Sequence, residues 1–134
     1  LLVLGDNFFG ENPIKHIDFA NFEKNKGSII FTKAVDNPSE FGVALVDEYG
    51  KVKHIEEKPE KPNSNLAVVG VYIFDHLAMD YIKLLKPSKR GEYEITDLIN
   101  IYISQSICSN IQLLDWWIDA GTPERILDLE SKLS

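Results

Sequence analysis

The order of strand-like and helix-like segments constrains the fold of this 134-residue chain most strongly. Residues 1–4 form a continuous apolar run, as in a strand covered on both faces, and residues 28–35 form a second predicted strand, rich in β-branched side chains. Between them, residues 13–26 carry apolar side chains at helical spacing and end before Gly27, which predicts a helix. A strand, a helix and a strand in this length predict a βαβ unit with parallel strands and a right-handed crossover.

The second half of the chain continues the alternation after one inserted hairpin, which is predicted for residues 41–57 around a turn that contains Gly50. Residues 66–74 are the most apolar segment and are predicted to be a core strand. The later segments are predicted, in order, as helix, helix, strand and helix: residues 76–86, residues 93–104, residues 111–114 and the residues that follow Thr122 and Pro123. This order predicts a single α/β domain over residues 1–134, with three layers and a mostly parallel mixed sheet.

Charge and hydropathy narrow the classes of partner. The net charge of −7 argues against nucleic acid, whose phosphates require a basic stripe on the protein. No apolar run reaches the roughly 18 residues that a membrane-spanning helix needs, so no membrane partner is predicted. The single cysteine, Cys108, excludes an internal disulfide framework and fits a reducing compartment, so we expect a cytoplasmic protein.

The chain opens directly in the apolar residues 1–4, without a methionine or a polar lead-in. We therefore expect it to be part of a longer protein. A buried strand that has lost its neighbours would expose apolar surface and an unpaired edge, both of which favour self-association. A homo-oligomer is the predicted assembly.

Two aspartates follow apolar segments at opposite ends of the chain. Asp6 follows the first predicted strand, and Asp119 follows the apolar residues 116–118. Because ligands of open α/β sheets bind beyond the carboxyl ends of the strands, we predict that both aspartates share one divalent metal ion. Glu57 and Lys58 end another predicted strand and would lie at the same edge. An alternative interpretation is that each aspartate only serves a turn.

Five short motifs occur in the order and spacing of one known family. They are Leu4-Gly5-Asp6-Asn7, Glu56-Glu57-Lys58-Pro59, Gly70-Val71-Tyr72, Arg90-Gly91-Glu92-Tyr93-Glu94-Ile95-Thr96-Asp97 and Trp117-Ile118-Asp119-Ala120-Gly121-Thr122. With them the chain resembles the sugar-1-phosphate nucleotidyltransferases, in particular the thymidylyltransferases that act on glucose 1-phosphate. The resemblance implies a Rossmann-like fold of the nucleotide-diphospho-sugar transferase type. It also implies a Mg²⁺-dependent reaction that joins a nucleoside triphosphate, here dTTP, to glucose 1-phosphate and gives dTDP-glucose and pyrophosphate.

The resemblance further implies roles for single residues. Asp6 and Asp119 match the family's two metal-binding aspartates, which would be catalytic because Mg²⁺ on their oxygens lets two anionic phosphates approach. Glu57 matches a carboxylate that accepts hydrogens from sugar hydroxyls, and Lys58 matches the cation that binds the sugar's phosphate. Neighbouring residues of a straight strand face opposite ways, so both reach one ligand only if the backbone bends, as Pro59 suggests. The alternative is a solvated charge pair in a hairpin.

Five further positions match substrate contacts in the family. Gly42 would let the backbone approach the sugar, and Val68 and Gly70 would line the same pocket. Arg90 matches a position that contacts phosphate, and its alternative is a solvated surface arginine. Trp117 would form a wall of the site, or is simply a core aromatic residue.

The resemblance does not extend to the family's Gly-rich loop that cradles the triphosphate, which would precede Asp6. We therefore expect the chain to be the sugar-phosphate-binding portion of a nucleotidyltransferase domain. By itself it is expected to be inactive, because that loop supplies much of the charge stabilisation in the transition state. Alternatives are a family member that uses UTP, ATP or CTP, and a non-catalytic sugar-phosphate-binding or interaction domain. A glycosyltransferase is disfavoured, because residues 5–7 lack the second acidic residue that would hold its metal.

Overall fold

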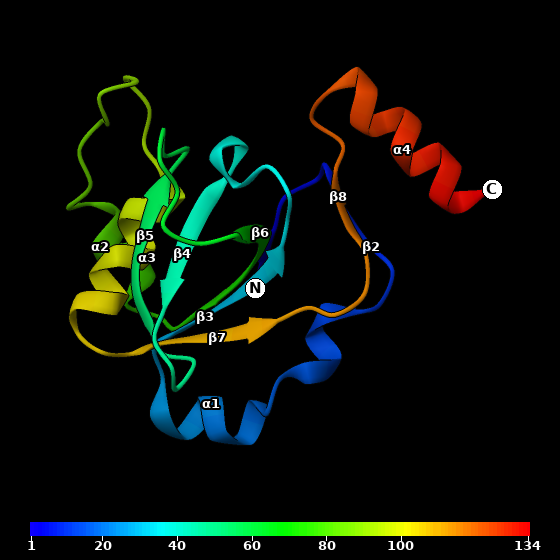
Figure 1. The fold of residues 1–134 in the computed structure, drawn as a ribbon. Helices are drawn as coiled ribbons and strands as arrows, with labels where there is room; N and C mark the ends of the chain where they lie inside the picture. The colour runs from blue at the N-terminus through cyan, green and yellow to red at the C-terminus, as the bar shows by residue number, and fades with distance from the viewer.

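Strand β6 (Leu66–Phe74) is the central element of the fold, as its apolar sequence predicts. All of its residues except the first and last are buried in the computed structural model, which describes residues 1–134. It belongs to a six-stranded sheet in the order β5-β4-β6-β3-β7, in which β1 also pairs with β6 (Figure 1). The other strands of this sheet are β1 (Leu2–Val3), β3 (Ser28–Ala34), β4 (Gly42–Val46), β5 (Val52–Glu57) and β7 (Cys108–Gln112).

Most neighbouring strands of the sheet are antiparallel. Only β3 and β7 pair in parallel, whereas β1, β3 and β4 are antiparallel to β6, and β4 and β5 form the predicted antiparallel hairpin. The mixed α/β class is therefore confirmed, but the prediction of a mostly parallel sheet is wrong for these strands. The reason is that β4 and β5 are joined by a tight turn, and β5 leads to β6 through the loop of residues 58–65. Neither connection carries the helix that a parallel crossover usually needs.

The predicted βαβ unit has the expected strand directions but not the expected pairing. Strands β1 and β3 are both antiparallel to β6, so they run the same way with β6 between them. The prediction that the first strand is covered on both faces is also wrong, because Leu2 and Val3 are 39% and 49% exposed. Strand β1 has only two residues, pairs with β6 along one edge, and has both of its apolar side chains exposed.

Helices cover both faces of the sheet, which confirms the predicted three layers (Figure 1). Alternation along β3 supplies both cores: Ile30 packs in a cluster with Tyr102 of the helix α3, and Phe31 packs in a second cluster with Ile17. Helices α2 and α3 lie on the first face, and the 3-10 helix η1 and α1 on the second. Their bounds are η1 (Pro13–His16), α1 (Phe19–Asn25), α2 (Ala78–Ile82) and α3 (Ile95–Ser104).

Two predicted helices are shorter in the structure. Residues 13–26 do not form one helix, because the chain leaves η1 and restarts as α1 after Asp18, whose carboxylate accepts a hydrogen bond from the Asn21 backbone N–H. The helix predicted over residues 76–86 is reduced to α2, whereas that predicted over residues 93–104 is confirmed as α3.

A two-stranded ribbon brings the first and last parts of the chain together. Strand β2 (Asn7–Phe9) pairs antiparallel with β8 (Trp117–Asp119), and Figure 1 shows them side by side. The final helix, α4 (Pro123–Leu133), begins as predicted, with the Thr122 hydroxyl accepting a hydrogen bond from the Arg125 backbone N–H. The ribbon therefore fixes the start of α4 beside the start of β2.

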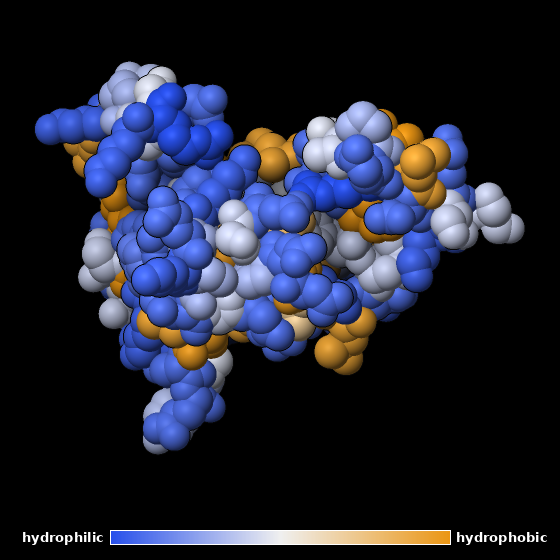
Figure 2. Space-filling view, turned by 45° about the horizontal axis from the view of Figure 1, so that its top comes forward, coloured by the Kyte–Doolittle hydropathy of each residue, from blue (hydrophilic) through white to orange (hydrophobic).

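The face drawn in Figure 2 is mostly hydrophilic, and its apolar side chains lie in separate patches. Helix α4 contributes exposed apolar side chains at Ile126, Leu127 and Leu133. None of the helices combines the length and the apolar character needed to cross a membrane.

Candidate functional site

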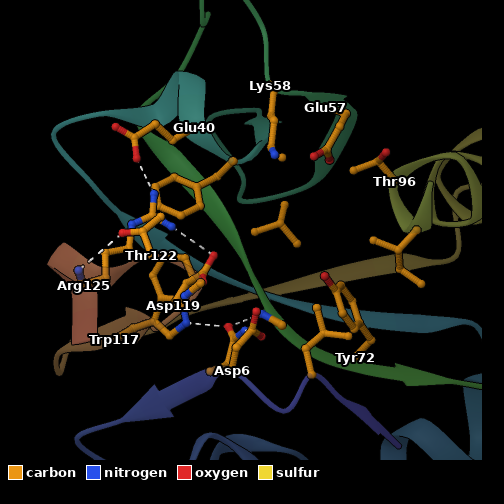
Figure 3. Close-up of a pocket in the computed structure, with 18 residues that line it drawn as sticks. Asp6, Glu40, Glu57, Lys58, Tyr72, Thr96, Trp117, Asp119, Thr122 and Arg125 are labelled. Atoms are coloured by element: carbon orange, nitrogen blue, oxygen red, sulfur yellow. Dashed lines mark hydrogen bonds and ion pairs between the residues drawn. The ribbon is translucent and has the colours of Figure 1, made fainter. Parts of the chain in front are cut away.

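A cavity of about 570 Å³ opens between the β2–β8 ribbon, the β4–β5 hairpin and the start of α3. Figure 3 shows the side chains that line it. Eight predicted site residues are among them: Asp6, Gly42, Glu57, Lys58, Val68, Gly70, Trp117 and Asp119. The fold therefore brings residues from the beginning, the middle and the end of the chain into one cavity.

Asp6 and Asp119 come together through the β2–β8 ribbon. The backbone N–H of Ala120 donates to the Asp6 carbonyl at 2.7 Å, and the N–H of Gly121 donates to Asp119 Oδ1 at 2.8 Å. A Cβ added at Gly121 would lie 2.8 Å from Asp119 Oδ1 and 3.8 Å from Asp6 Oδ2. Both carboxylates thus face the same small space, which only a glycine at position 121 leaves open.

Asn7, which sequence reasoning missed, connects this pair to the central strand. Its Oδ1 accepts hydrogen bonds from the Gly70 backbone N–H at 2.8 Å and from Trp117 Nε1–H at 2.7 Å, and its Nδ2 donates to Asp6 Oδ1 at 2.8 Å. One amide therefore fixes Asp6, β6 and β8 relative to each other. Asn7 stands in the Gly5-Asp6-Asn7 motif, but two of its three partners, Gly70 and Trp117, lie far along the chain.

Glu57 and Lys58 both line the cavity although they are adjacent in sequence. The predicted bend is present at Lys58, whose φ is +43°, and its backbone N–H donates to the Phe41 carbonyl at 3.0 Å. Burial raises the pKa of the Glu57 carboxyl above its usual range, and the Glu94 carboxylate adds to the rise, while Lys58 and Arg90 oppose it. The two side chains thus offer an acceptor and a cation to one ligand.

Gly42, Val68 and Gly70 also line the cavity. A Cβ at Gly42 would approach Thr96 Cγ2 to 3.0 Å and Glu57 Oε2 to 3.2 Å, so this glycine keeps the cavity open beside Glu57. Val68 is 8% exposed. Thr96 lines the cavity as well, and it was also missed although it lies in a quoted motif.

Aromatic side chains bound the cavity on two sides. The Trp117 ring packs against Phe41 with centroids 5.2 Å apart, so it is both a cavity wall and part of the packing. Tyr72 lines the cavity too, and burial raises its pKa, with the Glu57 and Asp6 carboxylates adding to the rise. Its phenol therefore stays neutral as a hydrogen-bonding group.

Arg90 does not line this cavity. Its guanidinium lies between carboxylates, 3.6 Å from Glu57 Oε1, 3.3 Å from Glu92 Oε2 and 3.5 Å from Glu94 Oε1. It borders an adjoining hollow on the other side of Glu57. The acidic cluster thus holds Arg90 outside the cavity, and its contact with a substrate phosphate stays a prediction.

The second cation of the cavity is Arg125, which sequence reasoning also missed. Its Nη1 lies 3.2 Å from Asp119 Oδ2, its Nη2 pairs with Glu40, and its guanidinium sits 4.6 Å from the centroid of the Phe41 ring. Arg125 belongs to the first turn of α4, whose start was predicted. The turn geometry was therefore foreseeable, but not the carboxylates that face it.

The residues present fit a hard divalent cation such as Mg²⁺. Asp6 and Asp119 supply carboxylate oxygens that face one space, and no cluster of three or more potential metal-binding side chains is present. Mg²⁺ commonly binds through one or two carboxylates and completes its shell with water and substrate phosphate. Two aspartates beside an open cavity match that pattern better than they match an all-protein cage.

The comparisons with known proteins point to one family. Residues 1–134 match the family model for nucleotidyl transferase. A glucose-1-phosphate thymidylyltransferase of Xanthomonas campestris pv. campestris is 41% identical over 128 residues, which are 93% of this chain and 43% of that protein. A low-salt glycan biosynthesis nucleotidyltransferase of Haloferax volcanii is 38% identical over 130 residues, which are 96% of this chain and 36% of that protein. The chain spans less than half the length of these curated relatives.

Solved structures share the fold. A Bacillus anthracis protein described as a glucose-1-phosphate thymidylyltransferase, crystallised with sucrose, superposes with a TM-score of 0.86 and 38% identity over 97% of this chain and 52% of its own. A UDP-glucose pyrophosphorylase complexed with UDP-glucose gives a TM-score of 0.82 and 25% identity over 98% of this chain and 54% of its own. The five motifs, the fold and these matches agree, and the chain belongs to the nucleotidyl transferase family.

Proposed function

We propose that the cavity binds a sugar 1-phosphate together with Mg²⁺, and that the protein containing this chain transfers a nucleotide from dTTP to glucose 1-phosphate. The observation that supports this most is the convergence of Asp6 and Asp119 with Glu57 and Lys58 in one cavity. The names of several relatives, glucose-1-phosphate thymidylyltransferases, support the choice of substrates.

Each residue has a separate task in the proposed reaction. An oxygen of the sugar phosphate attacks the α-phosphorus of the triphosphate, a new P–O bond forms, and pyrophosphate leaves with the electrons of the bond that breaks. Lys58 holds the phosphate of the sugar, and Glu57 accepts hydrogen bonds from sugar hydroxyls. Asp6 and Asp119 would hold Mg²⁺, which neutralises the phosphate charge and aligns the reacting groups.

We further propose that dTTP is the preferred nucleotide, that the protein forms a homo-oligomer and that it is located in the cytoplasm. Relatives include a UDP-glucose pyrophosphorylase, so UTP is the first competitor of dTTP. The exposed apolar side chains of β1 support a homo-oligomer, and the free, buried Cys108 is compatible with the cytoplasm.

The function is tested in the complete protein by pyrophosphate release from dTTP, UTP, ATP or CTP with glucose 1-phosphate and Mg²⁺. We expect turnover with dTTP to exceed that with the other triphosphates. Asp119→Asn should lower turnover at saturating substrate by about a hundredfold or more, the usual cost of one oriented charge in such a site. Asp80→Asn is the matched control, because Asp80 is an exposed residue of α2 that lines neither the cavity nor the hollow beside Asp119. Equal turnover of both variants would refute the metal site.

The sugar-phosphate contact has its own pair of variants. Lys58→Met should raise the KM for glucose 1-phosphate about tenfold or more, as expected for loss of a charge-assisted hydrogen bond. Lys61→Met, an exposed lysine of the same loop outside the cavity, should leave it unchanged. Equal KM values would remove Lys58 from the substrate site.

A further inference from the structure

Arg125 is held in the cavity by three contacts from two segments that lie far apart in the sequence. It pairs with Asp119 at the end of β8, it pairs with Glu40 just before β4, and it packs over the ring of Phe41. Figure 3 shows its side chain between Glu40 and Asp119. Its side chain is only 21% exposed, so the guanidinium is a built part of the cavity wall.

The side chains that line the cavity carry more negative than positive charges, so Arg125 has a large share in neutralising them. These charges comprise four carboxylates, those of Asp6, Glu40, Glu57 and Asp119, and only two cations, Lys58 and Arg125. Arg125 contacts two of the four carboxylates, so it is the main internal neutraliser on the side of Asp119.

We propose that Arg125 is an internal counter-cation with which a divalent cation must compete for Asp119, and that cation binding therefore depends on a phosphate-bearing ligand. The inference rests on the proposed function, because it takes Asp119 as a metal ligand. Arg125 acts here as a positioning residue.

The dependence follows from electrostatics. A divalent cation that arrives alone competes with Arg125 for Asp119 and is repelled by it, which weakens binding. A phosphate supplies further oxygens, so the cation and the guanidinium can both be neutralised at once. Arg125 needs no large movement for this, since Glu40 and Phe41 still hold it when the Asp119 contact is lost.

Binding of the two ligands is therefore coupled, and the coupling is reciprocal. Glucose 1-phosphate should tighten the binding of Mg²⁺, and Mg²⁺ should tighten the binding of glucose 1-phosphate by the same factor. Removing the positive charge at position 125 should weaken this coupling while it improves the binding of Mg²⁺ alone. A purely structural role for Arg125 would predict neither change.

Isothermal titration calorimetry of the complete protein tests the inference, with Mg²⁺ titrated alone and in saturating glucose 1-phosphate. Arg125→Gln should bind Mg²⁺ alone about fivefold more tightly, which corresponds to the upper range for a partly exposed ion pair. The tightening by glucose 1-phosphate should shrink by at least the same factor. If Arg125→Gln does not fold, Arg125→Lys is measured instead and should show a smaller change of the same sign.

Two variants separate the possible failures. Glu40→Gln removes the other carboxylate partner of Arg125 but leaves the Asp119 contact, so it should not tighten the binding of Mg²⁺ alone. An equal gain in Glu40→Gln would assign the effect to loosening of α4 and overturn the inference. Asp119→Asn should weaken Mg²⁺ binding in every background. If it does not, the proposed metal site fails; if it does and Arg125→Gln has no effect, only the inference on Arg125 fails.

Discussion

The close contact between Gly70 and Asn7 allows a sharp test of how the site is built into the central strand. A Cβ added at Gly70 would lie 2.6–2.8 Å from the three side-chain amide atoms of Asn7, which is closer than packed atoms tolerate. Gly70 does not have a positive φ, so Gly70→Ala meets no backbone strain and tests packing alone. Overpacking of this kind costs about 2 kcal/mol of unfolding free energy.

Asn7→Ala removes the obstacle but has its own cost. The backbone N–H of Gly70 and the Nε1–H of Trp117 lose their acceptor in a partly buried place. Because water reaches part of this region, we expect a destabilisation of about 2 kcal/mol, below the sum for two fully buried donors. Asn63→Ala, at an exposed loop residue, is the control and should cost less than about 0.5 kcal/mol.

The double variant decides the question. Without the Asn7 amide the new methyl group has room, so the double variant should lose about 2 kcal/mol rather than the roughly 4 kcal/mol of two independent effects. Urea unfolding of all variants, with the denaturant slope compared to check the two-state assumption, measures these free energies. Additivity within about 0.5 kcal/mol would refute the contact between Asn7 and Gly70 as the source of both costs.

Gly121→Ala should weaken the binding of Mg²⁺ measured by calorimetry, because its Cβ would lie 2.8 Å from Asp119 Oδ1. Gly5→Ala is the control and should leave the Mg²⁺ affinity unchanged, because its Cβ would meet nothing within 4 Å. Equal Mg²⁺ affinities of the two variants would contradict this geometry. Glu57→Gln should be more stable than the wild type at pH 7, because the folded state raises the pKa of Glu57. This advantage in stability should vanish as the pH falls through the raised pKa to the ordinary value of 4.5. Thermal unfolding as a function of pH measures it, and a difference in stability that stays constant with pH would show that the pKa of Glu57 is not raised. Residues 1–134 alone should release no pyrophosphate from dTTP, glucose 1-phosphate and Mg²⁺, and turnover above the background without protein would show that the triphosphate loop of the family is dispensable.

Local patterns predicted the parts of the fold that depend on nearby residues. The apolar run of β6, the hairpin of β4 and β5 with Gly50 in its turn, and the start of α4 at Thr122 are all as expected. Each depends on side-chain period or turn chemistry within a few residues. The prediction of one helix over residues 13–26 was wrong for a local reason too, since the Asp18 side chain caps the N-terminus of a separate helix, α1.

The pairing of strands was not accessible in the same way. A continuous apolar run is compatible with parallel or antiparallel neighbours. The position of β6 between β3 and β4 depends on the path of the connecting loops, which contain no crossover helix. The exposure of Leu2 and Val3 likewise depends on what packs against the faces of β1, not on their own hydrophobicity.

At the candidate site, local sequence patterns identified the available chemistry: two aspartates after apolar segments, and an acid beside a lysine at a bend. The neighbours of these residues come from the packing of distant segments. The tertiary structure placed Asn7 against Asp6, set Arg125 against Asp119, and drew Arg90 away from the cavity into an acidic cluster. Turn and period signals act within a few residues. Charges, in contrast, interact according to their distance in the folded molecule, and that distance depends on the packing of the whole chain.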